Sequence, residues 1–377
     1  HHDAALLAVG GYGRGELFPY SDIDILILLD DESNSNNQHI PSNIEKFIAR
    51  CWDSGLEIGS AVRSLSECLS EAAGDITIRT SVLEARPIGG NRGLFKHFKR
   101  NLEEAMEPKA FFQAKLLELQ QRHYKYQETP YALEPNCKES PGGLRDLQII
   151  LWVSKAAGLG HSFTDLHKKG LITARELKEL NRNQKLLQTI RANLHLLAKR
   201  RQDVLVFDLQ AALAKQSGIQ QDSARLASEE LMRHYYWAAK AVSQLNTILM
   251  QNIEALLFPN EARTTHPIPG VGNEMFIERQ GLLDIVDQNL YQKHPEAILQ
   301  TFLIFAQNPA ITGLSATVFR ALYNARQLMD ATWRKDPRNR ARFMELLKLP
   351  DGVTTAFRLM NQTSVLGRYL PSFRRIV

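Results

Sequence analysis

The 377-residue chain is longer than one typical hydrophobic core needs, so two or three domains are expected. Its 46 basic and 41 acidic residues leave a formal net charge of +5, which is mild for this length and does not indicate a nucleic-acid partner. The three cysteines form no CxxC pair, and no apolar run reaches the roughly 18 residues that span a bilayer, so we expect a cytoplasmic protein without disulfides or a membrane segment.

The first hundred residues mix short apolar strands with helices. Ala5–Val9 and Ile23–Leu29 are apolar runs bounded by turn-forming residues, which predicts two buried strands. A loop rich in Ser, Asn and Asp is expected from Asp30 to Ser42, followed by an amphipathic helix from Ile44 to Trp52. A third strand is expected over Leu56–Val62, so this part of the chain should form a small mixed sheet.

After Asp75 the apolar residues repeat at three and four positions, which predicts a mainly helical remainder. Ser64 and Glu67 have the spacing of a capping box and should open a helix, as should Thr173 and Glu176. The helix after Thr173 is expected to carry one apolar stripe, made by Leu177, Leu180, Leu187, Ile190, Leu194 and Leu197.

Two clusters of proline and glycine, Pro130–Gly143 and Pro259–Gly272, mark the expected junctions between domains. We therefore predict an α+β chain in three parts. A domain with a small mixed sheet should occupy residues 1–105, a helical domain residues 106–258, and a further helical segment residues 259–377.

A glycine-rich loop follows the first predicted strand. Gly10, Gly11 and Gly13 let the backbone approach a phosphate closely, so that N–H groups can donate to its oxygens, and Arg14 adds a positive charge. A glycine-rich turn alone is usually only a tight turn. It is not a Walker A loop, since no Gly-Lys-Ser/Thr follows, and it lacks the crossover helix of a Rossmann fingerprint.

Ser21 and two aspartates stand at the start of the second predicted strand. Asp22 and Asp24 flank Ile23, and the two-residue period of a strand places both carboxylates on one face. An Asp-x-Asp pair alone is usually a solvated strand end. Ahead of a buried strand and just after the glycine loop, however, two uncompensated charges would be costly, so the combination predicts a Mg²⁺ site beside a phosphate loop.

This order of motifs resembles the DNA polymerase β-type nucleotidyltransferase superfamily. The resemblance implies a polymerase β-like fold for the N-terminal domain and two Mg²⁺ ions, with Mn²⁺ as an alternative, held by Asp22, Asp24 and a third carboxylate on a neighbouring strand. It also implies in-line attack on an α-phosphate, in which positioning and charge stabilisation supply most of the catalysis.

The third carboxylate should come from the segment between Trp52 and Gly59. Asp53 and Glu57 are an even number of residues apart, so both would face the metal site if the segment were extended. By resemblance to related transferases with an Asp-x-x-Leu pattern, Asp53 is favoured as the catalytic and metal-binding residue. Glu57 stays the alternative, and Asp53 could also simply end the preceding helix.

Longer blocks are similar to the PII uridylyltransferase family. They are Val-Gly-Gly-Tyr-Gly-Arg-Gly-Glu-Leu from Val9, Gly-Ser-Ala-Val-Arg-Ser-Leu from Gly59, Asn-Cys-Lys-Glu-Ser-Pro-Gly-Gly-Leu-Arg-Asp from Asn136, and Met-Asn-Gln-Thr-Ser-Val-Leu-Gly-Arg-Tyr from Met360. The resemblance thus covers nearly the whole chain.

Basic residues in the helical region are further candidates for binding the nucleotide. Lys138 and Arg145 lie in the polar block after Asn136 and are predicted to face the nucleotide. Arg191 is predicted as a triphosphate contact and forms an i, i+4 pair with His195, which alone is better explained by packing. Arg200 and Arg201 are the remaining candidates for a triphosphate contact. Most charged side chains of this kind are solvated.

The family resemblance implies transfer of UMP from UTP to a tyrosine hydroxyl of the PII signalling protein, with no nucleic-acid or membrane partner. The family's phosphohydrolase domain and its two glutamine-sensing domains are not expected within these residues, so we expect transfer without UMP removal and without glutamine control. Two alternatives remain open: an ATP-using adenylyltransferase of the glutamine synthetase-modifying type, and a nucleotide-sensing module without turnover.

Overall fold

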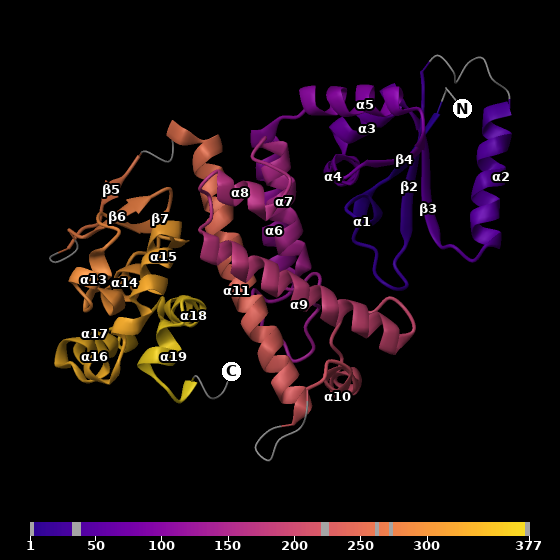
Figure 1. The fold of residues 1–377 in the computed structure, drawn as a ribbon. Coiled ribbons are helices and arrows are strands. Elements are labelled where there is room, and N and C mark those ends of the chain that lie inside the picture. The colour runs from indigo at the N-terminus through magenta and orange to yellow at the C-terminus, as the bar shows by residue number, and fades with distance from the viewer. Residues whose placement is uncertain (1–3, 32–38, 220–225, 261–263, 271–273, 374–377) are drawn as a thin grey trace. The chain divides into compact units, whose positions relative to one another are not determined.

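The computed structural model describes residues 4–31, 39–219, 226–260, 264–270 and 274–373, so most of the loop predicted after Asp30 lies outside the described residues. The chain divides into two compact units, each formed by several stretches of sequence (Figure 1). The first unit comprises His1–Ser140, Leu151–Ser162 and Lys185–Leu231. The second comprises Pro141–Ile150, Phe163–Gln184 and Met232–Val377.

The first unit contains a four-stranded mixed sheet in the order β3-β2-β1-β4. β2 and β3 pair in parallel orientation. β1 pairs with both β2 and β4 in antiparallel orientation. The strands are β1 (Ala4–Ala8), β2 (Ile23–Leu29), β3 (Ile58–Ser64) and β4 (Arg86–Gly90). The predicted small mixed sheet is therefore confirmed.

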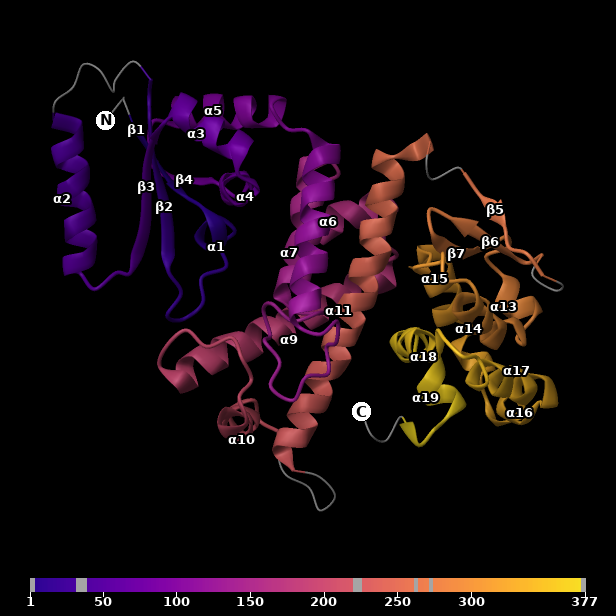
Figure 2. The same cartoon turned by 180° about the vertical axis from the view of Figure 1, so that it is seen from behind.

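Helices cover both faces of this sheet. In both views α2 (His39–Asp53) lies on one face, and α3 (Leu65–Gly74), α4 (Ile76–Leu83) and α5 (Arg92–Glu104) lie on the other (Figures 1 and 2). Leu26 and Leu28 of β2 are buried in the core that includes residues of α3 and α5. Asp22 and Asp24 share the face of these two leucines, because side chains alternate along a strand.

The end of α2 differs from the prediction and explains why β3 begins later. The N–H of Gly55 donates to the carbonyl of Trp52, and the N–H of Leu56 donates to the carbonyl of Cys51, while Gly55 has φ +75°. This pattern is a Schellman motif, in which a left-handed glycine reverses the chain after the last helical residue. Asp53 is therefore the last residue of α2 and does not lie in an extended strand.

The rest of the first unit is helical. It contains α1 (Gly10–Gly13), α6 (Pro108–Lys125) and α10 (Phe207–Gln216), and the boundary between the two units falls inside α7 (Leu144–Ala156), α9 (Ala174–Ala198) and α11 (Ala227–Leu257). The capping box predicted for α9 is present, since Thr173 N–H donates to Glu176 and Glu176 N–H donates to Thr173 Oγ1.

The second unit is mainly helical but contains a second four-stranded sheet in the order β5-β6-β7-β8. The prediction of a mainly helical remainder after Asp75 is confirmed, but the second sheet was not predicted, because its strands have only two to four residues and leave no periodic pattern. The sequence pattern does not predict β4 either, for another reason. It is an exposed edge strand containing Pro87, a residue that sheets tolerate at edges.

The core of the second unit centres on α14 (Ala297–Gln307), whose residues from Ala297 to Phe305 are all buried. The other elements of this unit are α8 (Phe163–Lys168), α13 (Leu290–Lys293), α15 (Ala316–Ala325), the 3-10 helix η1 (Arg326–Leu328), α16 (Ala331–Lys335), α17 (Pro337–Leu347), α18 (Val353–Gln362), α19 (Val365–Tyr369), β5 (His266–Pro267), β6 (Phe276–Arg279), β7 (Leu282–Ile285) and β8 (Gly313–Leu314). Among the described helices, none has the length and apolarity that crossing a membrane requires.

The capping box at the start of α3 gives a first test. Ser64 accepts from the N–H of Glu67, and the Glu67 carboxylate accepts from the N–H of Ser64. We expect Ser64→Ala to lower the free energy of unfolding by about 0.5–2 kcal/mol, because an N–H of the first turn loses its acceptor. Urea denaturation measures this, with Ser70→Ala on the exposed face of α3 as the control. Equal stability of the two variants would contradict the assigned cap.

Candidate active site

The two aspartates lie at the beginning of β2, at the edge of an open pocket of about 550 Å³. Both line this pocket together with residues that connect α2 to β3, namely Trp52, Gly55, Leu56, Glu57, Ile58 and Gly59. The sequence thus brings a carboxylate pair and a segment some thirty residues away to one place, through the parallel pairing of β2 with β3.

The carboxylate of Asp24 fits between two glycines. A Cβ atom at Gly10 would lie 3.2 Å from Asp24 Oδ2, and a Cβ atom at Gly59 would lie 2.7 Å from Asp24 Oδ1. Gly10 belongs to the glycine loop after β1, and Gly59 pairs with Asp24 across the sheet. Glycine at both positions therefore makes room for this carboxylate.

The pair carries an unfavourable concentration of negative charge. Burial and the neighbouring charge of Asp22 raise the pKa of Asp24, while Arg201, Lys138 and Arg14 act in the opposite direction. Arg201 Nη1 lies 3.0 Å from Asp22 Oδ2, although both side chains are about half exposed. Cations from distant parts of the chain thus partly compensate the carboxylates, and a bound divalent ion would compensate them more fully.

The predicted glycine loop forms one helical turn, α1 (Gly10–Gly13). A Cβ atom at Gly13 would overlap the carbonyl oxygen of Glu84 and lie 3.0 Å from that of Ala8, so this position accepts only glycine without a shift of backbone. At Gly11 the nearest atoms would be 3.7 Å and 3.8 Å away, which is ordinary contact. Gly13 therefore serves packing, whereas a Cβ atom at Gly11 would meet its neighbours without overlap.

Arg14 is held by protein groups rather than pointing freely into the pocket. Its Nε lies 3.0 Å from Glu16 and 3.9 Å from Glu84, and its guanidinium carbon lies 5.6 Å from the ring centroid of Trp152. Burial raises the pKa of Glu84, and the charges of Lys155 and Arg14 oppose this. Arg14 thus contributes long-range positive charge to Asp24 while also anchoring the loop.

The segment before the aspartates is clamped by α9. Arg191 is buried, donates to Asp203 at 2.7 Å and lies with its guanidinium carbon 4.3 Å from the ring centroid of Phe18. His195 is fully buried, hydrogen-bonds the carbonyl of Pro19 through Nδ1, and lies with Nε2 3.0 Å from Asp203. The predicted i, i+4 pair therefore holds the loop that leads to Asp22.

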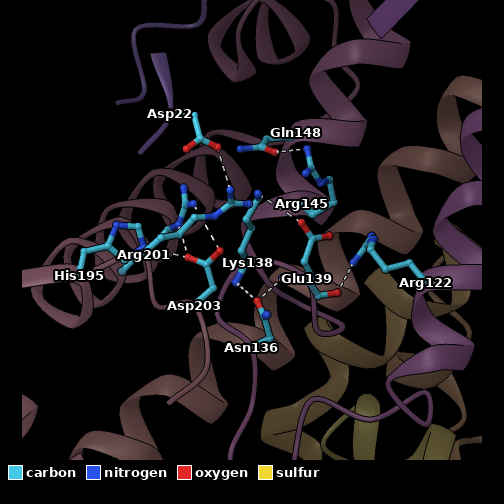
Figure 3. A network of polar contacts seen from close by, with 11 residues as sticks. Asp22, Arg122, Asn136, Lys138, Glu139, Arg145, Gln148, His195, Arg201 and Asp203 are labelled. Carbon is cyan, nitrogen blue, oxygen red and sulfur yellow. Dashed lines mark hydrogen bonds and ion pairs between the residues drawn. The ribbon is translucent and has the colours of Figure 1, made fainter. Parts of the chain in front are cut away.

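Asp203 is the centre of this clamp (Figure 3). Burial raises its pKa, but the hydrogen bond and charge of Arg191 outweigh burial and hold the pKa of Asp203 below its usual value. Its carbonyl accepts from the N–H of Cys137, and Val204 forms an isolated bridge with Asn136. The loop after α9 is thereby fixed to the segment around residue 136.

The position of Lys138 depends on this pairing of the two loops. Asn136 Oδ1 accepts from the N–H groups of Lys138 and Glu139, and Arg122 donates to the carbonyl of Glu139, so the turn is held on both sides (Figure 3). The charge of Lys138 acts on both Asp24 and Asp203. Lys138 and Arg201 thus reach the carboxylate pair from two loops that hydrogen-bond to each other.

Other predicted residues have different positions. The N–H of Ser21 donates to the carbonyl of Phe18, which shapes the turn before Asp22. Arg145 lies in the second unit, where its Nη1 donates to Gln148 at 2.9 Å. Nucleotide contacts by Ser21, Arg145 and Arg191 stay predictions. Arg201, another candidate from the sequence, forms an ion pair with Asp22.

The structure separates the two candidates for the third carboxylate. Asp53 ends α2 and is not among the residues that line the pocket, so the argument that placed it on a strand is wrong. Glu57 lines the pocket, and its carbonyl accepts from the N–H of Ile23, which places it beside Asp22 in the parallel register. Glu57 therefore shares a sheet face with Asp22, Asp24 and Gly59.

These residues fit a divalent metal site only in part. Within the described residues, no three His, Cys, Asp or Glu side chains are gathered closely enough to hold an ion. The pair of aspartates fits such a group, because two hard carboxylates on one strand face suffer mutual repulsion that a cation removes. The Glu57 side chain would need to turn toward the pair to complete the set.

Comparison with known proteins finds three family models that match parts of the chain. Residues 1–77 match a family model described as nucleotidyltransferase domain, residues 110–250 one described as GlnD PII-uridylyltransferase, and residues 276–369 one described as uridylyltransferase GlnD third domain. The chain belongs to the GlnD uridylyltransferase family.

Relatives named bifunctional uridylyltransferase/uridylyl-removing enzyme match this family member over nearly its whole length. That of Cupriavidus pinatubonensis is 61% identical over 375 residues, covering 100% of the chain and 42% of the relative. That of Cupriavidus metallidurans is 59% identical, again over 100% of the chain and 43% of the relative. That of Ralstonia nicotianae is 58% identical over 99% of the chain and 42% of the relative. The chain thus spans less than half the length of these relatives.

The two glycines of α1 give a test of the loop's packing. Gly13→Ala should lower the free energy of unfolding by about 1–3 kcal/mol, because the new Cβ must displace the backbone at Glu84. Gly11→Ala should change it little, since its surroundings are at ordinary contact distance. Chemical denaturation at unchanged m-value compares the two. A Gly11→Ala variant as unstable as Gly13→Ala would contradict this packing.

Proposed function

We propose that the chain transfers UMP from UTP to a tyrosine hydroxyl of a PII protein and releases pyrophosphate. Support comes chiefly from the pocket that Asp22, Asp24 and Glu57 line, with the glycine loop beside Asp24. The family models that match the chain name a nucleotidyltransferase and a PII-uridylyltransferase, which agrees with this chemistry. The reaction belongs in the cytoplasm, where nucleoside triphosphates and signalling proteins occur together.

The residues of the site divide into two sets by charge. Asp22, Asp24 and Glu57 would hold Mg²⁺, or Mn²⁺ in its place, as hard oxygen ligands. Divalent ions at such a site lower the pKa of an attacking hydroxyl and neutralise the leaving pyrophosphate. The triphosphate would lie along the glycine loop near Gly10 and Gly11, where cationic side chains surround the site, namely Arg14, Lys138 and Arg201.

The acceptor hydroxyl requires a base. A tyrosine has a pKa near 10 and is therefore largely protonated at neutral pH. We assign Glu57 to accept its proton as the new bond between the phenolic oxygen and the α-phosphorus forms and the bond to the pyrophosphate oxygen breaks. The cations around the glycine loop then stabilise the negative charge that develops on the leaving pyrophosphate.

The proposal is tested by supplying a PII protein, UTP and Mg²⁺ and measuring pyrophosphate release together with the mass of PII. We expect a PII mass increase of one UMP with UTP and much less with ATP. Asp22→Asn and Asp24→Asn should each abolish transfer, because each removes a metal-binding carboxylate, and neither should unfold the protein. Full activity of both variants, or transfer from ATP in preference to UTP, would refute the proposal.

A second experiment assigns the third carboxylate. Glu57→Gln should keep most of the UTP affinity but reduce transfer by about 10²–10⁴-fold, the usual effect of removing a positioned base. Asp53→Asn should keep most of the activity and gain about 0.3–1 kcal/mol of stability, because an acidic side chain at a helix C-terminus opposes the helix dipole. Single-turnover transfer and thermal unfolding measure the two effects. The reverse order of activities would return the role to Asp53.

A further inference from the structure

The pocket beside the aspartates has an apolar side that the chemistry of nucleotidyl transfer does not explain. Trp52 and Leu56 line it next to Glu57, yet they are 59% and 45% exposed. Trp52 lies in the last turn of α2, and Leu56 follows the left-handed Gly55. The Schellman motif therefore fixes both side chains on either side of one tight turn, at the edge of the carboxylate pocket.

Strand order separates this apolar side from the glycine loop. In the order β3-β2-β1, the strand that carries the aspartates lies between the strand that precedes the glycine loop and the strand that follows Glu57. The two oxygens of Asp24 reflect this, because Oδ2 is nearest to Gly10 and Oδ1 is nearest to Gly59. The glycine loop and the Trp52–Gly59 segment thus lie on opposite sides of the carboxylate.

The geometry of in-line transfer indicates which side holds the leaving group and which side the acceptor approaches from. The attacking and leaving oxygens lie roughly in line through the phosphorus that is transferred. If the pyrophosphate leaves toward the glycine loop, whose last turn is followed by Arg14, the acceptor hydroxyl must approach from the side of β3. That side offers one carboxylate, Glu57, and two exposed apolar side chains, Trp52 and Leu56.

We propose that Trp52 and Leu56 form the subsite for the acceptor, where they bind the tyrosine-bearing loop of the PII protein and place its phenol beside Glu57. This inference rests on the proposed function and adds the place and the chemistry of acceptor binding. An aromatic side chain on a polypeptide loop suits such a subsite, since aromatic rings pack on each other with favourable geometry and exclude water. The 550 Å³ pocket is open, as a subsite for a loop of a folded protein must be.

The experiment compares Trp52→Ala, Leu56→Ser and the matched control Phe47→Ala. Phe47 is an exposed aromatic residue of the same helix, 38% exposed, and it does not line the pocket. We expect Trp52→Ala to raise KM for PII about 10- to 30-fold, the range of a hot-spot residue, and Leu56→Ser to raise it less. The dissociation constant of Mg²⁺-UTP, measured by calorimetry without PII, should change less than about twofold.

Intrinsic fluorescence gives a readout that does not depend on turnover. The chain has four tryptophans, of which Trp152 and Trp333 are buried. PII binding should change the emission of the parent protein, and the part due to Trp52 should disappear in Trp52→Phe, a variant that keeps an aromatic ring and most of the activity. Phe47→Ala should match the parent protein in every assay.

Three outcomes decide between the explanations. If the parent protein transfers UMP to PII and Trp52→Ala keeps its KM for PII, the subsite is wrong while the proposed function stands. If Trp52→Ala instead weakens Mg²⁺-UTP binding, Trp52 serves the nucleotide and the subsite is again refuted. If the parent protein binds Mg²⁺-UTP but transfers no UMP to PII, the proposed function fails, and the inference fails with it.

Discussion

The carboxylate of Asp24 imposes the constraint on which the site depends. It is half-buried between the glycine loop and β3, with a second aspartate two residues earlier on the same strand face. Burial and the charge of Asp22 raise the pKa of Asp24, and neighbouring cations lower it. The need for space explains Gly10 and Gly59, and the need for charge explains why two loops beyond residue 135 bring Lys138 and Arg201 to this point.

Features that depend on local sequence were predictable. The limits of β2 follow from an apolar run that only Asp24 interrupts, and both capping boxes follow from a spacing of three residues. The third carboxylate was harder, because even spacing argues for a shared face only if the segment is extended. The signal that could have decided was Gly55, since a glycine just after a helical pattern indicates a C-terminal cap and turns Asp53 into a helix residue.

Long-range pairs set the limit of such predictions. Arg191 and His195 have the spacing of two side chains on one helix face, and nothing local distinguishes a phosphate contact from a structural one. Their structural partners, Asp203, Phe18 and Pro19, lie far apart in the sequence and leave no local signal. Arg201 is likewise defined by its distance to Asp22, which no periodicity reports.

Long-range contacts also indicate which segments of the chain the site requires. The predicted division at residue 105 remains a prediction, but many interactions of the first unit cross it. Lys155 donates to the carbonyl of Leu83 and lies 3.8 Å from Glu84, which in turn lies 3.9 Å from Arg14 of the glycine loop. Burial lowers the pKa of Lys155 and raises that of Glu84, so each group depends on the other for its charge. Residues 1–105 alone would leave Glu84 without Lys155 and Asp22 without Arg201, and Asp24 would lose the charges of Arg201 and Lys138, which lower its pKa. The nucleotidyltransferase site is therefore built by the sheet and the helical segments of the first unit together.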